Sequence, residues 1–517
     1  MSGAYDYSYW SKAFKSQRNE FDYTVSEVDG SIPASLQGSL FRAMPALFER
    51  GGRPYGHYLD GDGYITRLTF PGSGKSPRFQ SAFVKTPEFL MEQAQDKVLT
   101  RSTFRTQREA NVIGDKLCLN NALDLKLKNP ANTNVISWGG KLLALFEAGV
   151  PTELDPSSLE TKGSFDMNIG ARSGLAVRIP ELYQFSSALH DVFFGGTFVT
   201  AHPKVDVFRQ RLIAWTSRAQ VDPSRDLLKS NPLLEIHEWD TSFQLIPESP
   251  TQYLLENTAT ACHDFSVTEN FYIFVENRMG GDTLPYVLGT KNAAECINID
   301  TSKEMLFHAV ARPGGKAAGT KPIVIPLQPG FTIHSPCAFE NEKGQLELYT
   351  TAWDSQAVQA GEAKGGLLGS WEGTAPHFDD IPVTLLYKTV VDLNRGVLIS
   401  HAPVPGQADV IVEHPHINPN YETKPVRFLH MSVGSTTKAS SPPLGYQRVD
   451  LETGEVQRWY APEHTYCEEV VVVPKAGASG SAQAQGEDAV WLLATMYDAV
   501  LDRSCIGVID GEKVGRG

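Results

Sequence analysis

Three histidines, His202, His263 and His334, lie in short, apolar, strand-like stretches of a 517-residue chain. The intervals between them are 263 − 202 = 61 and 334 − 263 = 71 residues. No helix presents side chains that far apart to one ligand, so the three meet only in a fold that brings separate strands to one point. A radial arrangement of strands does this. The pattern therefore predicts a β-propeller with imidazoles converging on its axis, and such a cluster suggests a metal.

Short strand signals recur along the whole chain and are separated by turns rich in glycine. The clearest lie at residues 142–147, 271–276, 345–350, 470–474 and 490–496. Many short strands with turns between them favour a propeller or another all-β design. No crisp repeat motif such as Trp-Asp occurs, so the number of blades does not follow from the sequence.

Two segments have a helical pattern. Residues 86–96 begin with Thr86 as a cap and Pro87 in the first turn. Residues 179–194 are apolar and aromatic, and they suit a helix that covers one face of the propeller or rests on a membrane surface. A low-complexity stretch at residues 476–486 is a loop between two strands, so one domain is the simplest account of the chain.

Composition excludes several classes of function. The net charge of −14 disfavours binding to the phosphate backbone of nucleic acids. Six cysteines without framework spacing favour a reducing, intracellular compartment. The N-terminus has no signal-peptide pattern, and no apolar run approaches 18 residues. We therefore expect a cytoplasmic or peripherally membrane-associated protein.

The chemistry of the histidines depends on their neighbours. Neutral imidazole is the commonest protein ligand for iron, copper and zinc, and widely spaced ligands suit an open catalytic centre better than structural zinc. A ligating imidazole usually donates its other N–H to a carboxylate. Glu147, Glu413 and Glu469 are candidates, although each equally suits a charge at a strand edge. Cys262 and Cys337 lie close to two of the histidines, and we expect them to be small buried hydrophobes.

Several further motifs occur in a characteristic order. They are Gly30-Ser-Ile-Pro-Ala-Ser-Leu-Gln-Gly-Ser-Leu-Phe-Arg42, His57-Tyr-Leu-Asp-Gly-Asp-Gly63, Ala131-Asn-Thr-Asn134, Leu142-Leu-Ala-Leu-Phe-Glu147, the three histidine stretches, Leu284-Pro-Tyr286 and Glu295-Cys296. Together they resemble the carotenoid cleavage oxygenases over nearly the whole chain. This family includes enzymes that cleave apocarotenoids, carotenoids and stilbenes, and the retinoid isomerase.

The resemblance implies an all-β, seven-bladed propeller whose helical and loop insertions cap the face that holds the active site. It implies non-haem iron(II) on the axis, held by four histidines, with three glutamates hydrogen-bonded to ligand histidines. His202, His263 and His334 match three of the ligands. Glu147, Glu413 and Glu469 match the glutamates, although His414-Pro-His416 after Glu413 departs from the usual motif.

Two further features depart from the family pattern. Arg42-Ala-Met-Pro45 stands where relatives commonly have Arg-Asn-Gly-Pro. The family's fourth histidine lies in a His-Gly segment after the last strand, and no histidine here has that context; His464 lies in a loop before Glu469. We therefore expect residues 1–517 to form a single propeller domain that lacks its extreme C-terminal segment, and to dissolve poorly because an unclosed propeller exposes strand edges.

The implied activity is that of a dioxygenase (an oxidoreductase that incorporates O2) cleaving a conjugated C=C bond to two carbonyl products. The implied partners are O2 and a lipophilic polyene, with an apocarotenoid or carotenoid preferred and transient membrane contact allowed. A stilbene is the alternative substrate, with Lys126 or Lys128 holding its phenol, although a surface position explains both lysines. A non-catalytic carotenoid- or retinoid-binding propeller is the alternative without chemistry. The sequence gives neither the tunnel residues nor the oligomeric state.

Overall fold

The computed structural model describes most of the chain. The described residues are 5–108, 121–122, 124–169, 176–177, 199–221, 230–247, 249–255, 262–282, 284–300, 302–355, 358, 373–378, 381–436, 440–475 and 486–515. The apolar segment at residues 179–194, most of the low-complexity loop and Cys118 lie outside this description.

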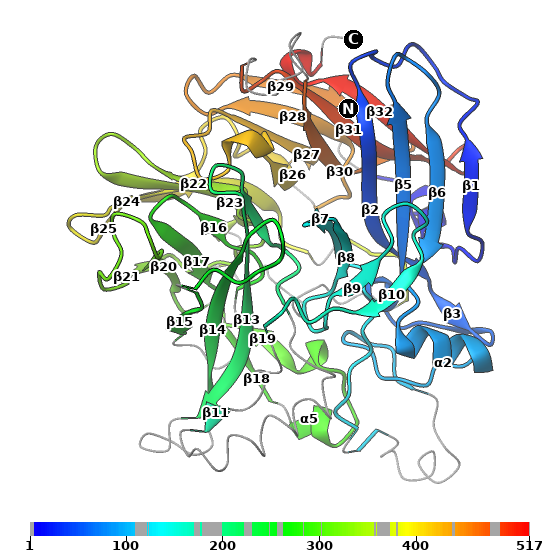
Figure 1. The fold of residues 1–517 in the computed structure, drawn as a ribbon, viewed down its shortest axis with the longest axis horizontal. Coiled ribbons are helices and arrows are strands. Elements are labelled where there is room, and N and C mark those ends of the chain that lie inside the picture. Colours follow the sequence, from blue (N-terminus) through cyan, green and yellow to red (C-terminus); the bar gives the residue numbers. More distant parts are fainter. Residues whose placement is uncertain are drawn as a thin grey trace.

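Seven sheets form a ring, and each is one blade of a β-propeller (Figure 1). The first two blades consist of β1 (Phe21–Thr24), β2 (Gln37–Leu47), β5 (Asp62–Pro71) and β6 (Arg78–Phe83), and of β7 (Asn134–Trp138), β8 (Lys141–Leu145), β9 (Thr152–Leu154) and β10 (Thr161–Ser164). The third consists of β11 (Ala176–Val177), β12 (Lys204–Asp206), β13 (Arg211–Val221), β14 (Ser230–Trp239) and β15 (Thr251–Leu254).

The remaining four blades follow in chain order. Blade 4 contains β16 (Ser266–Val267), β17 (Phe271–Glu276), β20 (Met305–Ala311) and β21 (Ile323–Leu327), and blade 5 contains β22 (Cys337–Glu340), β23 (Gln345–Trp353), β24 (Thr384–Asp392) and β25 (Val397–Pro403). Blade 6 contains β26 (Val410–His416), β27 (Phe428–Thr436), β28 (Gly445–Asp450) and β29 (Val456–Tyr460), and blade 7 contains β30 (Thr465–Pro474), β31 (Val490–Asp498) and β32 (Arg503–Asp510). The predicted seven-bladed propeller is confirmed.

Helices and minor strands lie before the first blade and in insertions between and within the blades. Those in the described part of the chain include α1 (Tyr7–Trp10), α2 (Pro87–Gln95), α5 (Leu284–Val287), and the two-stranded sheets of β3 (Glu49–Arg50) with β4 (Arg53–Pro54) and of β18 (Met279–Gly281) with β19 (Ile297–Ile299). The predicted cap of α2 is present, because the Thr86 hydroxyl accepts a hydrogen bond from Phe89 N at 3.2 Å.

The strands form where the sequence alternates or runs apolar, as expected of sheets packed face to face. All six residues of β17 are buried, and the faces of β17 and β20 pack against the neighbouring blade 5. Each blade therefore buries one face against each neighbour, and the hydrophobic core is a series of clusters between blades.

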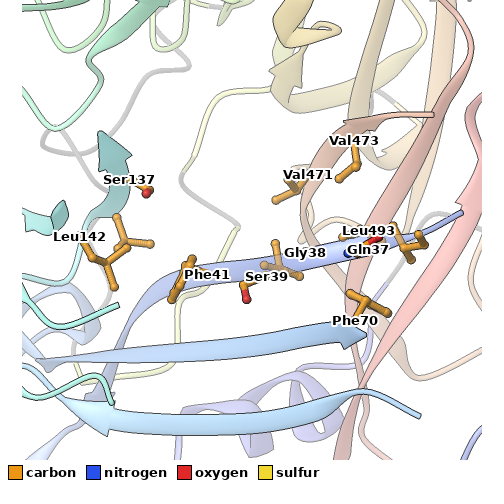
Figure 2. Close-up of a pocket in the computed structure, with 13 residues that line it drawn as sticks. Gln37, Gly38, Ser39, Phe41, Phe70, Ser137, Leu142, Val471, Val473 and Leu493 are labelled. Atoms are coloured by element: carbon orange, nitrogen blue, oxygen red, sulfur yellow. The ribbon is translucent and has the colours of Figure 1, made fainter. Parts of the chain in front are cut away.

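The ring is closed by packing of the first blade against the last. Leu40, Leu68 and Phe70 of blade 1 form one hydrophobic cluster with Leu493 of blade 7. Figure 2 shows Leu493 beside the start of β2, with Val471 and Val473 of β30 facing the same space. Residues more than four hundred positions apart thus share one core.

Candidate metal centre

Each of the three histidines lies in a connection that leads into a strand of a blade. His202 precedes β12, His263 precedes β16 and His334 precedes β22, in three consecutive blades. The strand-like stretches predicted around them are thus loops at the histidines themselves. Pro203 and Pro336 explain this for two of them, because proline has no N–H for a strand ladder.

The three imidazoles converge as predicted. Their ring centroids are 4.4 Å apart for His202 and His263, 5.3 Å for His202 and His334, and 5.1 Å for His263 and His334. One ring nitrogen from each lies within 4.8 Å of the others. This spacing fits three ligands of a single metal ion.

Two carboxylates engage the outer nitrogens of two cluster histidines. Glu147, which follows β8, pairs with Nδ1 of His263. Glu413, in β26, has its Oε2 2.6 Å from Nδ1 of His334, and its Oε1 accepts a hydrogen bond from the Thr351 hydroxyl at 2.9 Å. Both imidazoles therefore have Nδ1 occupied, which leaves Nε2 as the metal-binding nitrogen.

The third predicted carboxylate lies elsewhere in the network. Glu469 of β30 has its Oε1 2.6 Å from Nε2 of His416, which is not one of the cluster histidines. His414, two residues before His416, has its ring centroid 5.7 Å from that of His334 and its Nδ1 3.2 Å from the Ser432 hydroxyl. Sequence reasoning noted His414 and His416 only as a departure from the family motif, and it missed the pairing.

The donor set fits a divalent transition metal. His202 Nε2 is a buried nitrogen with no hydrogen-bond partner in the described part of the chain. Burial and the neighbouring imidazoles lower the pKa of His202 well below its usual value, so this ring is neutral and its lone pair is free to bind a metal. Burial acts in the same direction at His334, but the Glu413 carboxylate outweighs it and raises the pKa of His334 to about 9.

Cys262 and Cys337 do not join the cluster. Each is buried in a hydrophobic core between blades, and neither belongs to the described group of possible metal ligands. The expectation that they act as small buried hydrophobes is confirmed.

Lys126 and Lys128 differ from one another. The Lys126 side chain is half-exposed and pairs with Glu88 at 2.8 Å. Lys128 is fully buried, with its Nζ 2.6 Å from Asp62 and 2.7 Å from Glu92. The expectation that both are surface lysines is therefore wrong for Lys128, whose ammonium is held by two carboxylates and is not free to hold a substrate phenol.

A cavity of about 210 Å³ opens between blades 1, 2 and 7 (Figure 2). Its walls are mostly apolar, with Phe41, Phe70 and Leu142 from one side and Val471 and Leu493 from the other. No cluster histidine and no paired glutamate lines it. It is thus a packing space between blades and not part of the metal centre.

Among the described residues, none of the helices has the length and apolar character that a membrane-spanning helix requires.

Known proteins similar to this chain are oxygenases of one family, as the histidine cluster and its paired glutamates suggest. A family model described as retinal pigment epithelial membrane protein matches residues 14–516. The chain is 31% identical over 513 residues to apocarotenoid-15,15'-oxygenase of Synechocystis sp. (strain ATCC 27184 / PCC 6803 / Kazusa), covering 98% of this chain and 91% of that protein. It is 26% identical to the chloroplastic carotenoid cleavage dioxygenase 7 of Oryza sativa subsp. japonica, covering 97% and 86%. The crystal structure of cobalt-substituted Synechocystis ACO superposes with a TM-score of 0.81 and 27% identity, covering 100% of this chain and 95% of that one.

Proposed function

Because the chain belongs to the retinal pigment epithelial membrane protein family, the carotenoid cleavage oxygenases, we propose that it is a non-haem iron(II) dioxygenase that cleaves a conjugated C=C bond. The substrate is an apocarotenoid or carotenoid, and the products are two carbonyl compounds. The observation that carries the proposal is the convergence of three imidazoles, two of them held at Nδ1 by carboxylates.

The proposed roles follow from the atoms that are free. His202, His263 and His334 hold the metal through one ring nitrogen each. Glu147 and Glu413 hold the rings of His263 and His334 in the orientation that metal binding needs, and they increase the basicity of these ligands. Glu469 acts one step further out, by fixing His416. When bound, iron(II) would supply the reaction with O2 that breaks the double bond.

The preferred substrate class rests on the relatives. The Synechocystis oxygenase, named for apocarotenoid cleavage, shares more identity with this chain than the rice dioxygenase, named for carotenoid cleavage. Both are aligned over nearly the whole chain. The stilbene alternative, in which Lys126 or Lys128 holds the phenol of the substrate, loses its support at Lys128 because that ammonium is paired with two carboxylates.

The test is a substrate panel on iron-loaded protein. Apocarotenals of several chain lengths, a C40 carotenoid and resveratrol are incubated in air and under argon, and products are identified by mass spectrometry. We expect O2-dependent cleavage of an apocarotenal into two carbonyl products whose carbon numbers add up to that of the substrate. Cleavage of resveratrol alone would replace the substrate class. Tight binding of a polyene by iron-loaded protein without cleavage would identify a binding protein instead.

A further inference from the structure

Each cluster histidine has a close neighbour in sequence that meets the other two neighbours in space. Lys204 lies two residues after His202, Asp264 directly follows His263, and Ser335 directly follows His334. Since the three histidine connections belong to three different blades, contacts among these neighbours link the blades at the point where the imidazoles converge.

The three neighbours form a closed set of contacts. Lys204 Nζ is 2.9 Å from Asp264 Oδ1 and donates a hydrogen bond to the Ser335 carbonyl oxygen at 3.1 Å. The Ser335 backbone N–H donates to Asp264 Oδ2 at 2.8 Å. Every pair among the three connections is therefore joined by one polar contact.

These contacts are shielded from water. The side chains of Lys204 and Asp264 are 13% and 5% exposed. Charge-assisted hydrogen bonds are shorter and stronger than neutral ones, and a low local dielectric strengthens them further. Asp264 Oδ1 also accepts the Phe265 N–H at 2.7 Å, so the carboxylate holds its own connection as well as the other two.

We infer that Lys204, Asp264 and Ser335 form a clamp that sets the spacing of the three imidazoles, with Lys204 as a positioning residue for metal binding. The clamp residues are not among the described group of possible metal ligands, so the clamp acts through the backbone positions of the histidines. This inference rests on the proposed metal centre. It goes beyond the carboxylates paired with imidazole nitrogens, since none of the three clamp residues needs to touch an imidazole.

Substitution of Lys204 tests the clamp, because the direction of the change in metal affinity distinguishes loss of the clamp from loss of the charge. Its positive charge lies close to the metal centre and repels a divalent cation. Removal of that charge alone would therefore tighten metal binding. Removal of the clamp would weaken binding, because the imidazoles would no longer be held at the spacing one ion requires. The substitution Lys204→Met separates these two effects.

The measurement is a titration of metal-free full-length protein with Co(II). Calorimetry gives the affinity, and visible absorption gives the cobalt spectrum. For Lys204→Met we expect a roughly 10-fold weaker Co(II) affinity, at the lower end of the loss found for residues that orient metal ligands, and an altered cobalt spectrum. Lys204→Arg, which retains the charge and a donor, should recover part of the affinity.

Lys475→Met is the matched control. Lys475 is also 13% exposed, pairs with Asp510 at 2.7 Å and lies over an aromatic ring, that of Trp491. It lies after β30, and its contacts with Asp510, Glu512 and Trp491 involve no cluster histidine. We expect Lys475→Met to retain the wild-type Co(II) affinity and spectrum even if its melting temperature falls.

The outcomes are distinct. Wild-type or tighter Co(II) binding by folded Lys204→Met overturns the clamp and leaves the metal centre intact. Absence of Co(II) binding by the wild type overturns the proposed function itself. If Lys204→Met does not fold, Asp264→Asn, which keeps the side-chain volume, is measured in its place, and an unchanged affinity and spectrum again overturns the clamp.

Discussion

Oε2 of Glu413 lies 2.6 Å from Nδ1 of His334, and the two residues come from neighbouring blades. The same carboxylate accepts the His414 backbone N–H at 2.6 Å and the Thr351 hydroxyl at 2.9 Å. Three donors therefore fix Glu413, and Glu413 fixes the ring of His334. The orientation of one candidate metal ligand thus depends on an interaction across a blade boundary.

Replacement of this carboxylate should weaken metal binding. We expect Glu413→Gln to reduce iron affinity about 10- to 100-fold, since partners that orient a ligating imidazole contribute on that scale. Iron retained after desalting, measured by elemental analysis, checks this. Glu469→Gln is the comparison, because Glu469 contacts His416 instead of a cluster histidine, and we expect a smaller loss. Equal losses in the two variants would assign His416 to the metal as well.

Removal of the imidazoles themselves should abolish the centre. We expect His202→Ala, His263→Ala and His334→Ala each to bring iron after anaerobic Fe(II) loading close to zero per chain and to abolish alkene cleavage. His464→Ala is the control, because His464 stacks on Tyr9 at 3.8 Å and belongs to no described ligand group. Retention of about one iron per chain by any of the three variants would refute its role as a ligand.

The buried lysine beside blade 1 should be important for stability. Lys128→Met leaves Asp62 and Glu92 without one of their cations in a fully buried network, and breaking such a pair costs roughly 3–5 kcal/mol. Lys126→Met removes a half-exposed pair with Glu88 and should cost less than about 1 kcal/mol. Midpoints of denaturant unfolding distinguish the two. Similar midpoints for both variants would contradict this view of the network.

Glu422 should make stability depend on pH. Burial raises its pKa to about 7, with opposition from the Lys204 ammonium. Because the folded-state pKa lies above the usual value near 4.5, the protonated carboxyl favours folding below pH 4.5, and that contribution is lost as the pH rises towards 7. Glu422→Gln removes the dependence. We therefore expect the melting temperature of the variant to rise relative to that of the wild type between pH 4.5 and 7. A difference in melting temperature that stays constant over this range would contradict the raised pKa of Glu422.

Part of this site could be predicted from the sequence, because the signals for it lie in residues that are adjacent in the chain. The three histidines sit in short motifs whose neighbours, including Pro203 after His202 and Asp264 after His263, carry the family resemblance. The propeller followed from many short apolar strands separated by glycine turns. These signals depend on residues close together in the chain, so no spatial information was needed.

The pairing of Glu469 could not be read in this way. The register of β26 against β27 shifts between Glu413 and His416, and His414 has a positive φ of 51°. Pro415 between the two histidines lacks the N–H that a regular ladder requires, and the bulge changes which side chains face the centre. Similarly, the burial of Lys128 depends on Asp62 and Glu92, which approach it only in the folded blades.

The shared core of blades 1 and 7 has a consequence for the timing of biosynthesis. Leu40 cannot form its native contact with Leu493 until Leu493 has been synthesised. At roughly 5–20 residues per second, a ribosome needs about 20 to 90 s to make the roughly 450 residues between them. For that interval the apolar face of blade 1 that Leu493 later covers has no native partner. All three cluster histidines leave the ribosome well before Leu493 does. A nascent chain can therefore gather its imidazoles while the apolar face of its first blade is still exposed and prone to aggregation.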